Sequence, residues 1–230
     1  SSAASDVYKR QVLCSSEYLK EKVISRSGIN REVHIINNAI SLPQIRHFDS
    51  FPSKVQDAIN LLKSLKCSLL YIGTISQWFD FKLICEALDK KEDVQLVLIG
   101  PKDCDIPSHK QIHYIGSVER QYIYSLMEQA SALVMPFIVN ELIRSVNPVK
   151  MYEYIYMEKP IIAPHYGEME KFLPYINLYH DNDEFMSLVD QLSKSELQIS
   201  SEKGNEMKGF AEKNTWESRY EEVKKILFNV

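Results

Sequence analysis

Three features that reveal the class of many proteins are missing from this sequence: a basic excess, a long apolar run and closely spaced cysteines. The 27 lysine and arginine residues stand against 31 aspartate and glutamate residues, so the formal net charge is −4 at pH 7. Nucleic-acid-binding domains usually carry a basic excess, so we expect no nucleic-acid partner. No apolar run reaches the roughly 20 residues of a membrane span, and the polar first residues predict no signal peptide.

Paired cysteines of the kind found in zinc sites and redox motifs are also absent. The four cysteines lie far apart: Cys14, Cys67, Cys85 and Cys104. We therefore expect reduced, mostly buried thiols of a cytosolic protein. His109 and His113 are four residues apart, but no acidic or cysteine partner follows them at metal-ligand spacing, so we expect no metal site.

What the sequence contains is a regular alternation of apolar runs and amphipathic segments. A strand at 12–14, a Ser-capped helix and a strand at 33–36 come first, and the alternation is regular from Cys67 onward. Further strands are predicted within 67–74, 94–101, 111–117, 131–137, 160–165 and 176–180. Further helices are predicted within 53–64, 79–91, 119–130, 148–159, 183–195 and 214–230. This order predicts an α/β fold with a Rossmann-like, doubly wound parallel sheet.

Ligands of such a sheet bind beyond the carboxyl ends of its strands. The candidate loops follow Ile72, Ile99, Ile115 and Phe137. Only the last of them is long, and long loops in compact domains tend to carry function. We therefore expect the site to lie near the polar loop 140–147.

The segment after that loop has the features of an anion-binding helix start. Asn147 is suited to cap the helix and Pro148 to occupy its first position. The backbone N–H groups of Val149 and Lys150 then point into the loop, where the helix dipole and the lysine charge favour a phosphate. Glu153 lies three residues further on the same helical face, and its carboxylate can accept hydrogen bonds from the vicinal hydroxyls of a ribose. The same spacing also fits an ordinary lysine–glutamate pair on a helix surface.

Four long runs of the chain form a recognisable set. They are YIGTISQWFDFKLI, VQLVLIGP, QIHYIGSVERQYIYSLMEQASALVMPF and NPVKMYEYIYMEKPIIAP. Together they resemble the C-terminal domain of GT-B glycosyltransferases, in particular retaining enzymes of the "group 1" type, which build polysaccharides and cell-envelope glycans. The resemblance implies one half of a GT-B fold, a nucleotide-diphosphate sugar donor such as a UDP- or GDP-sugar, transfer to an acceptor hydroxyl, and no cofactor.

In that family the last run has the form E-x7-E, and its second glutamate holds the donor ribose. Glu153, with Pro160 seven residues on, matches this second glutamate. The first glutamate is due where this chain has Ser145, so the sequence departs from the family at that position. A subset with the form NEL…NPVK…EY implies Glu141 as the sugar-side, catalytic carboxylate, although a loop-capping or surface role fits Glu141 equally.

A second departure concerns the arginine and lysine that usually follow the first strand of this domain. Thr74 and Phe79 stand at those places. The departing diphosphate needs its charge neutralised, and the resemblance leaves Lys150 or Arg144 to supply that charge. A solvated loop arginine is the plainer interpretation of Arg144.

The remaining donor contacts that the resemblance implies involve the main chain. Gly73 and Thr74, after the first strand of the regular part, either let the backbone approach the nucleotide or form a plain turn. Ser117 and Val118 match the place where this fold holds the nucleotide base through main-chain groups. His165, which ends a strand near the cleft, is a candidate for sugar contact.

The resemblance also divides the chain. Residues 1–11 look like a non-native or disordered tail, 12–45 like a remnant of the N-terminal GT-B domain with its linker, and 46–230 like the nucleotide-sugar-binding domain. The helix around Trp216 resembles the one that crosses back toward the N-terminal domain. The chain would then lack most of the half that binds a glycan or lipid-linked acceptor, and we expect it to be inactive alone.

The resemblance implies a cytoplasmic protein, and it leaves open a peripheral association of the full protein with the inner face of the membrane. Two other interpretations stay open. The departures at Ser145 and Thr74 also fit a non-catalytic nucleotide-sugar or glycan-binding module. A GT-B sugar-nucleotide epimerase would need further acid and base residues in the cleft, and the sequence does not offer them.

Overall fold

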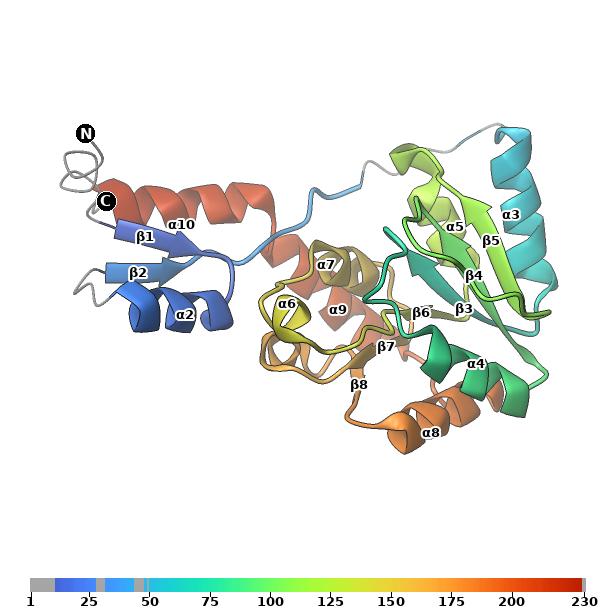
Figure 1. Ribbon diagram of the computed structural model, residues 1–230. Coiled ribbons are helices and arrows are strands. Elements are labelled where there is room, and N and C mark those ends of the chain that lie inside the picture. Colours follow the sequence, from blue (N-terminus) through green and yellow to red (C-terminus); the bar gives the residue numbers. More distant parts are fainter. Residues whose placement is uncertain (1–10, 28–31, 44–47, 49, 229–230) are drawn as a thin grey trace.

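A six-stranded, all-parallel sheet forms the centre of the larger part of the molecule (Figure 1). The computed structural model describes residues 11–27, 32–43, 48 and 50–228, so the predicted tail 1–11 lies outside the described residues except for Gln11. The strand order is β5-β4-β3-β6-β7-β8. The strands are β3 (Cys67–Ile72), β4 (Val94–Ile99), β5 (Ile112–Gly116), β6 (Ala132–Val134), β7 (Ile161–Pro164) and β8 (Asn177–Tyr179). The predicted Rossmann-like parallel sheet is thereby confirmed.

Helices cover both faces of this sheet, because its central strands are apolar on both sides. In β3, Leu70 and Ile72 face one core while Leu69 and Tyr71 face the other. The first face is covered by α3 (Ser53–Ser64), α5 (Ile123–Gln129), α7 (Val149–Tyr156) and α9 (Ser201–Lys213). The second is covered by α4 (Phe81–Lys90) and α8 (Asn182–Ser193). Side chains that alternate at period two therefore fill two cores from one strand.

Three elements were not expected from the sequence. The predicted loop 140–147 contains a short helix, α6 (Glu141–Arg144), which Asn140 caps by accepting a hydrogen bond from Ile143 N at 2.9 Å. A 3-10 segment, η2 (Gly167–Phe172), follows β7, and α9 follows α8. The predicted helix 119–130 begins as a 3-10 turn, η1 (Arg120–Tyr122), before it continues as α5. The prediction that 140–147 is a plain loop was therefore wrong.

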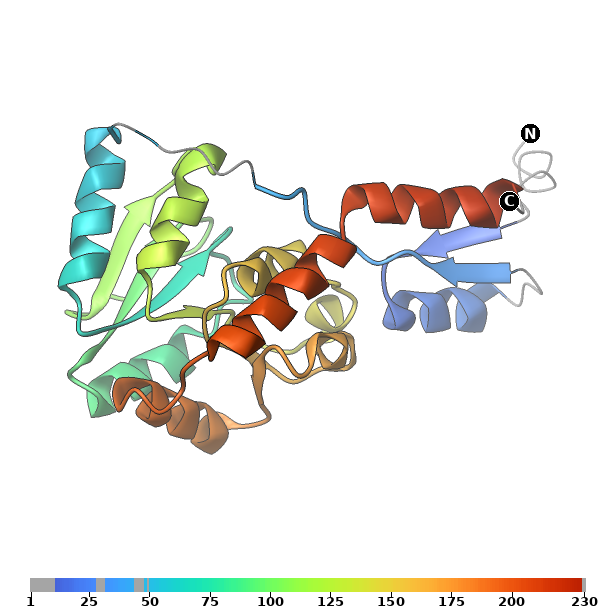
Figure 2. The ribbon, with the colours of Figure 1, turned by 180° about the vertical axis from the view of Figure 1, so that it is seen from behind.

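A small second unit is built from both ends of the described chain. It contains β1 (Gln11–Cys14), α2 (Glu17–Ser27), β2 (Glu32–Ile35) and α10 (Trp216–Phe228), with β1 and β2 paired in parallel (Figures 1 and 2). Gln11 Nε2 donates to Ile226 O at 3.2 Å, so the last helix returns to the N-terminal elements as predicted. None of the helices in the described part of the chain is both long and apolar enough to cross a bilayer.

Candidate functional site

The loops after β3, β4 and β5 lie against one another at the carboxyl edge of the sheet. Gly73 N donates to Ile99 O at 3.0 Å, and Gly100 N donates to Gly116 O at 3.0 Å. Gly100 has φ +141°, and a Cβ there would lie 2.1 Å from Gly73 O, so a side chain at this position would collide with the backbone. At this edge of the sheet, the loop after β3 therefore contacts the loop after β4 through backbone atoms.

The main-chain groups predicted to contact a nucleotide are already hydrogen-bonded in part. Thr74 O accepts from the Tyr71 hydroxyl at 2.8 Å, and Ser117 O accepts from Lys54 Nζ at 2.8 Å. Val118 packs against the core of the larger part from a partly buried position. Ser117 and Val118 lead directly into η1, which carries the first residue that the sequence analysis missed.

That residue is Arg120, which contacts the predicted ribose carboxylate. Glu153 lies on α7 with only 2% of its side chain exposed. Arg120 Nη2 donates to Glu153 Oε1 at 2.8 Å, and Lys150 Nζ donates to Glu153 Oε2 at 2.6 Å. The pairing of Lys150 with Glu153 follows from their spacing, but Glu153 is buried rather than on the helix surface. The structure thus brings the Ser117–Val118 loop, Lys150 and Glu153 together through Arg120.

Tyr154 fixes the position of α7 relative to this edge. Its fully buried hydroxyl accepts a hydrogen bond from Ile72 N at 2.9 Å. Ile72 ends β3 and immediately precedes Gly73, so the helix that carries Glu153 is attached to the first predicted loop. No signal in the sequence distinguished this tyrosine from its neighbours on the helix.

Asn147 does not cap α7, contrary to prediction. The capping position is Pro148, which makes no side-chain cap, and the helix begins at Val149. The buried Asn147 side chain accepts from Asn38 N at 2.8 Å and donates to Glu168 Oε2 at 3.2 Å. The extended backbone at Pro148 turns Asn147 away from the helix start and toward the linker. Asn147 therefore joins the linker to η2.

Glu141 faces the small unit. Its carboxylate lies 2.8 Å from Lys22 Nζ and accepts from the Tyr18 hydroxyl at 3.1 Å, and both partners belong to α2. The hydrogen bond from Lys22 holds the pKa of Glu141 below its ordinary value. Ser145, which stands where the family has its first glutamate, donates to Leu142 O at 2.6 Å and so ends α6.

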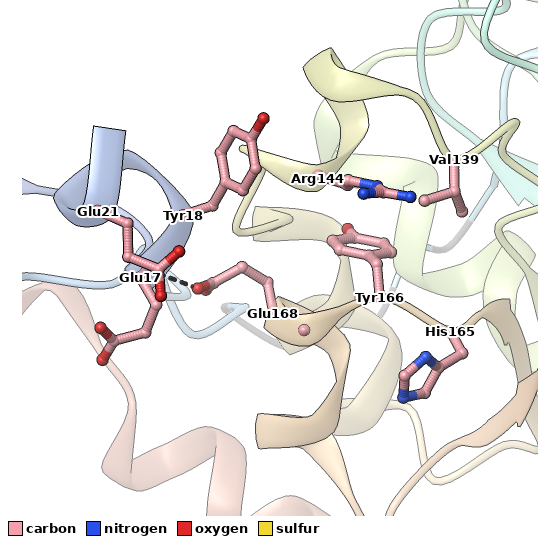
Figure 3. A pocket seen from close by; sticks show the side chains of 9 residues that line it. Glu17, Tyr18, Glu21, Val139, Arg144, His165, Tyr166 and Glu168 are labelled. Carbon is pink, nitrogen blue, oxygen red and sulfur yellow. Dashed lines mark hydrogen bonds between the residues drawn. The ribbon is translucent and has the colours of Figure 1, made fainter. Parts of the chain in front are cut away.

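Arg144 borders a cavity of about 540 Å³ between α2 and the β7–η2 connection (Figure 3). Its lining residues are Glu17, Tyr18, Glu21, Val139, Arg144, His165, Tyr166, Gly167 and Glu168. The buried Glu168 accepts from Glu17 N, at the start of α2, at 2.7 Å. His165 lines the same cavity, pairs with Glu170 at 2.9 Å and stacks on His180. The sequence did not single out Glu168, because the acidic and basic residues close to it in the sequence are typical of a surface turn.

The predicted residues thus fall into two groups. Lys150 and Glu153 lie with Arg120 beside the Ser117–Val118 loop, whereas Glu141 and Arg144 border hollows shared with α2. In the described ranges of the chain, no group of three or more histidine, cysteine, aspartate or glutamate side chains could hold a metal ion.

Comparisons with known proteins give the fold its class. No protein-family model matches the chain. HepE from Anabaena, solved with UDP and glucose, superposes with a TM-score of 0.71 at 13% identity, over 96% of this chain and 63% of HepE. The E. coli trehalose-6-phosphate protein bound to UDP-2-fluoro glucose gives a TM-score of 0.73 at 11% identity, over 96% of this chain and 61% of its own. The large part of this molecule is therefore the Rossmann-like half of a GT-B fold, as the sequence resemblance implied.

A curated relative is similar in sequence as well. It is a Bacillus subtilis (strain 168) protein named "Putative teichuronic acid biosynthesis glycosyltransferase TuaH", 24% identical over 227 residues, which cover 93% of this chain and 55% of the relative. The chain thus spans little more than half the length of this relative and less than two thirds of the two structures. It resembles GT-B glycosyltransferases over nearly all of its own length.

Proposed function

We propose that this chain is the donor-binding part of a GT-B glycosyltransferase. The reaction is transfer of a sugar from a nucleotide-diphosphate sugar to an acceptor hydroxyl in polysaccharide or cell-envelope glycan synthesis. The observation that carries the proposal is Glu153, a carboxylate buried between two cations beside the start of α7. The UDP bound to HepE and the cell-envelope role in the name of TuaH support the same conclusion.

The roles at the nucleotide end follow from the chemistry of these groups. Glu153 accepts hydrogen bonds from the ribose hydroxyls. Lys150 and the first-turn N–H groups of α7, including that of Val149, neutralise the diphosphate. The backbone of Gly73 and Thr74 lies alongside the phosphates, and that of Ser117 and Val118 along the base. Asn147 acts indirectly, by holding the segment before α7.

The sugar end is assigned to Glu141 and Arg144. Both border a hollow of about 370 Å³ together with Tyr18 and Lys22. Arg144 also borders the larger cavity and would contact the diphosphate or the sugar from that side. Glu141 acts as the sugar-side carboxylate only if it releases Lys22, which holds it at present.

The wider context completes the proposal. The donor is a UDP- or GDP-sugar, the acceptor is a glycan or a lipid-linked glycan, and the reaction needs no cofactor. We expect a cytoplasmic protein. We propose separately that the full protein associates peripherally with the inner face of the membrane. We also expect these 230 residues to bind nucleotide and, by themselves, to show no transferase turnover.

A thermal-shift panel of UDP, GDP, ADP and their sugars tests the donor site. A ligand at 100 times its Kd adds about 2.7 kcal/mol, which for a protein of this size raises Tm by roughly 5–11 °C. Glu153→Gln should abolish the shift. Lys82→Gln, at a side chain on α4 that is 86% exposed, should leave it unchanged. The absence of a shift with every nucleotide would contradict the proposal.

A non-catalytic module is the second candidate, and Ser145 in place of the expected glutamate favours it. The two candidates differ in the full-length protein. A transferase should lose most of its turnover of nucleotide sugar on Glu153→Ala, whereas a binding module has no turnover to lose. Measured sugar transfer by the full-length protein would therefore exclude the module.

A further inference from the structure

Glu153 is almost inaccessible in the arrangement described here. Arg120 takes one carboxylate oxygen at 2.8 Å and Lys150 the other at 2.6 Å, and only 2% of the glutamate side chain is exposed. A vicinal diol needs the same carboxylate oxygens, and although each oxygen can accept two hydrogen bonds, the glutamate is too deeply covered for a diol to approach. A ribose therefore reaches Glu153 only if one of the two cations moves.

The two cations are held differently. Lys150 lies one turn before Glu153 on the same helix, and its side chain is 28% exposed. Arg120 comes from the three-residue turn η1, and its side chain is 63% exposed. An ion pair with so exposed a partner is weak, since solvent screens it and the free side chain gains freedom. Arg120 is thus the group that moves.

The surroundings of Glu153 make an uncovered carboxylate costly. The neighbouring Tyr124 has its pKa raised by burial and, secondarily, by the charge of Glu153. Its hydroxyl is buried without a hydrogen-bond partner in the part of the chain that the structure describes. Glu153 itself is only 2% exposed, so whatever displaces Arg120 must bring hydrogen-bond donors of its own. Two adjacent ribose hydroxyls do so.

The displaced guanidinium in turn requires an anion. Its planar fork of N–H donors matches a phosphate. The segment after β3 offers no charge for a phosphate at Thr74 or Phe79, because Thr74 is uncharged and Phe79 is an apolar side chain buried in the core. The charge on Arg120 is therefore available for the diphosphate once the arginine leaves Glu153.

We propose that Arg120 covers Glu153 in the free protein and leaves it to bind the phosphates of an incoming nucleoside diphosphate. By this exchange Arg120 selects phosphorylated nucleotides against nucleosides. This inference rests on the proposed function. A nucleoside must displace Arg120 and leave it without a partner, whereas a nucleoside diphosphate supplies partners for both Glu153 and Arg120. Arg120 is thus a specificity-determining residue that lies outside the E-x7-E segment.

The test compares uridine and UDP, by NMR titration and calorimetry, on the wild type and on Arg120→Gln. The variant should bind uridine roughly threefold to tenfold more tightly and UDP roughly tenfold more weakly, magnitudes typical of one partly exposed charged hydrogen bond. Arg120→Lys keeps the charge without the planar fork and should lie between the two. Lys82→Gln removes one exposed positive charge on α4 and should change neither affinity.

The outcomes separate this inference from the proposed function. If Arg120→Gln changes both affinities by the same factor, or changes neither, the proposed exchange by Arg120 is wrong. The proposed donor site is not affected by that result. If the thermal-shift panel identifies GDP or ADP instead, guanosine or adenosine replaces uridine in the same comparison. If no nucleotide binds the wild type at all, the donor site itself is wrong and the exchange falls with it.

Discussion

Tyr154→Phe is the most direct test of how α7 is held against the sheet. The Tyr154 hydroxyl accepts from Ile72 N at 2.9 Å, and the side chain is fully buried. Gly73 N bonds to β4, so the N–H group of Ile72 points to the opposite side, toward β6. The pairing of β3 with β6 ends at Leu70. Tyr154 therefore supplies the acceptor that a longer β6 would have supplied.

The cost of the substitution follows from that single contact. Phenylalanine keeps the ring, so no cavity opens, but the buried N–H group of Ile72 loses its acceptor. An unsatisfied buried donor costs about 1–3 kcal/mol. For a chain of this size each kcal/mol lowers Tm by about 2–4 °C, so we expect a fall of roughly 2–12 °C.

Thermal and urea unfolding of Tyr154→Phe and Tyr156→Phe measure this difference. Tyr156 lies on the same helix, and no hydroxyl hydrogen bond is found for it among the described residues, so its variant should stay within about 0.5 kcal/mol of wild type. Nucleotide binding should also weaken in Tyr154→Phe, because Glu153 is the next residue along α7. Equal stability of the two variants would refute the reasoning, and unchanged nucleotide affinity would limit Tyr154 to a role in stability.

Three further predictions concern stability. Gln111→Leu should lower the free energy of unfolding in urea by about 1–3 kcal/mol, because the buried Gln111 amide shares its two N–H groups among the carbonyls of Leu88, Lys91 and Val94, which would lose them. Hydrogen bonds from Lys194 and Lys91 lower the pKa of Asp190 from its ordinary value, so its ion pairs stabilise the fold above that ordinary pKa and are lost as the pH falls through the lowered one. Asp190→Asn should therefore flatten the acid limb of Tm against pH, and an unchanged limb would contradict this. Gly100→Ala should destabilise by more than about 1 kcal/mol, whereas Gly209→Ala, in open space on α9, should be neutral or stabilising, as calorimetry of both variants will show.

The sequence predicts the central fold well where a single strand or helix carries its own signal. β3 is buried at all six positions, as its unbroken apolar run indicated. The buried face of α4 consists of Leu83, Ile84, Ala87 and Leu88, the helical spacing expected from the sequence. Local periodicity suffices in both cases, because the partners of these residues need only be apolar.

The missed helix α9 shows where periodicity fails. It has only three buried residues, Gly204, Met207 and Ala211, and a glycine is normally read as a helix breaker. A Cβ on Gly204 would come within 2.6 Å of Oε2 of Glu158, which lies two residues after the end of α7. The glycine therefore leaves room for the Glu158 side chain, a contact that only the tertiary structure reveals.

Contacts within the candidate site were predicted where the partners are near in sequence and missed where they are distant. Lys150 and Glu153 pair through one helical turn, which their spacing indicates. Arg120 lies 33 residues before Glu153 and contacts it only because β5 ends and α7 begins at the same edge of the sheet. Asn147 was expected to cap the helix that follows it. Its side-chain oxygen instead accepts a hydrogen bond from the backbone N–H of Asn38, 109 residues away.

These contacts divide the site by the part of the chain that builds it. The proposed nucleotide end, with Arg120, Lys150 and Glu153, lies entirely in the large part of the molecule, and these three side chains contact one another without α2. The sugar end does not, because Lys22 of α2 holds Glu141 and the start of α2 closes the cavity beside Arg144. A change in how α2 sits against the large part of the molecule would therefore alter Glu141, the proposed sugar-side carboxylate, and leave Glu153, the proposed ribose carboxylate, unchanged. Under the proposed function, nucleotide affinity and sugar transfer are for this reason expected to be separable.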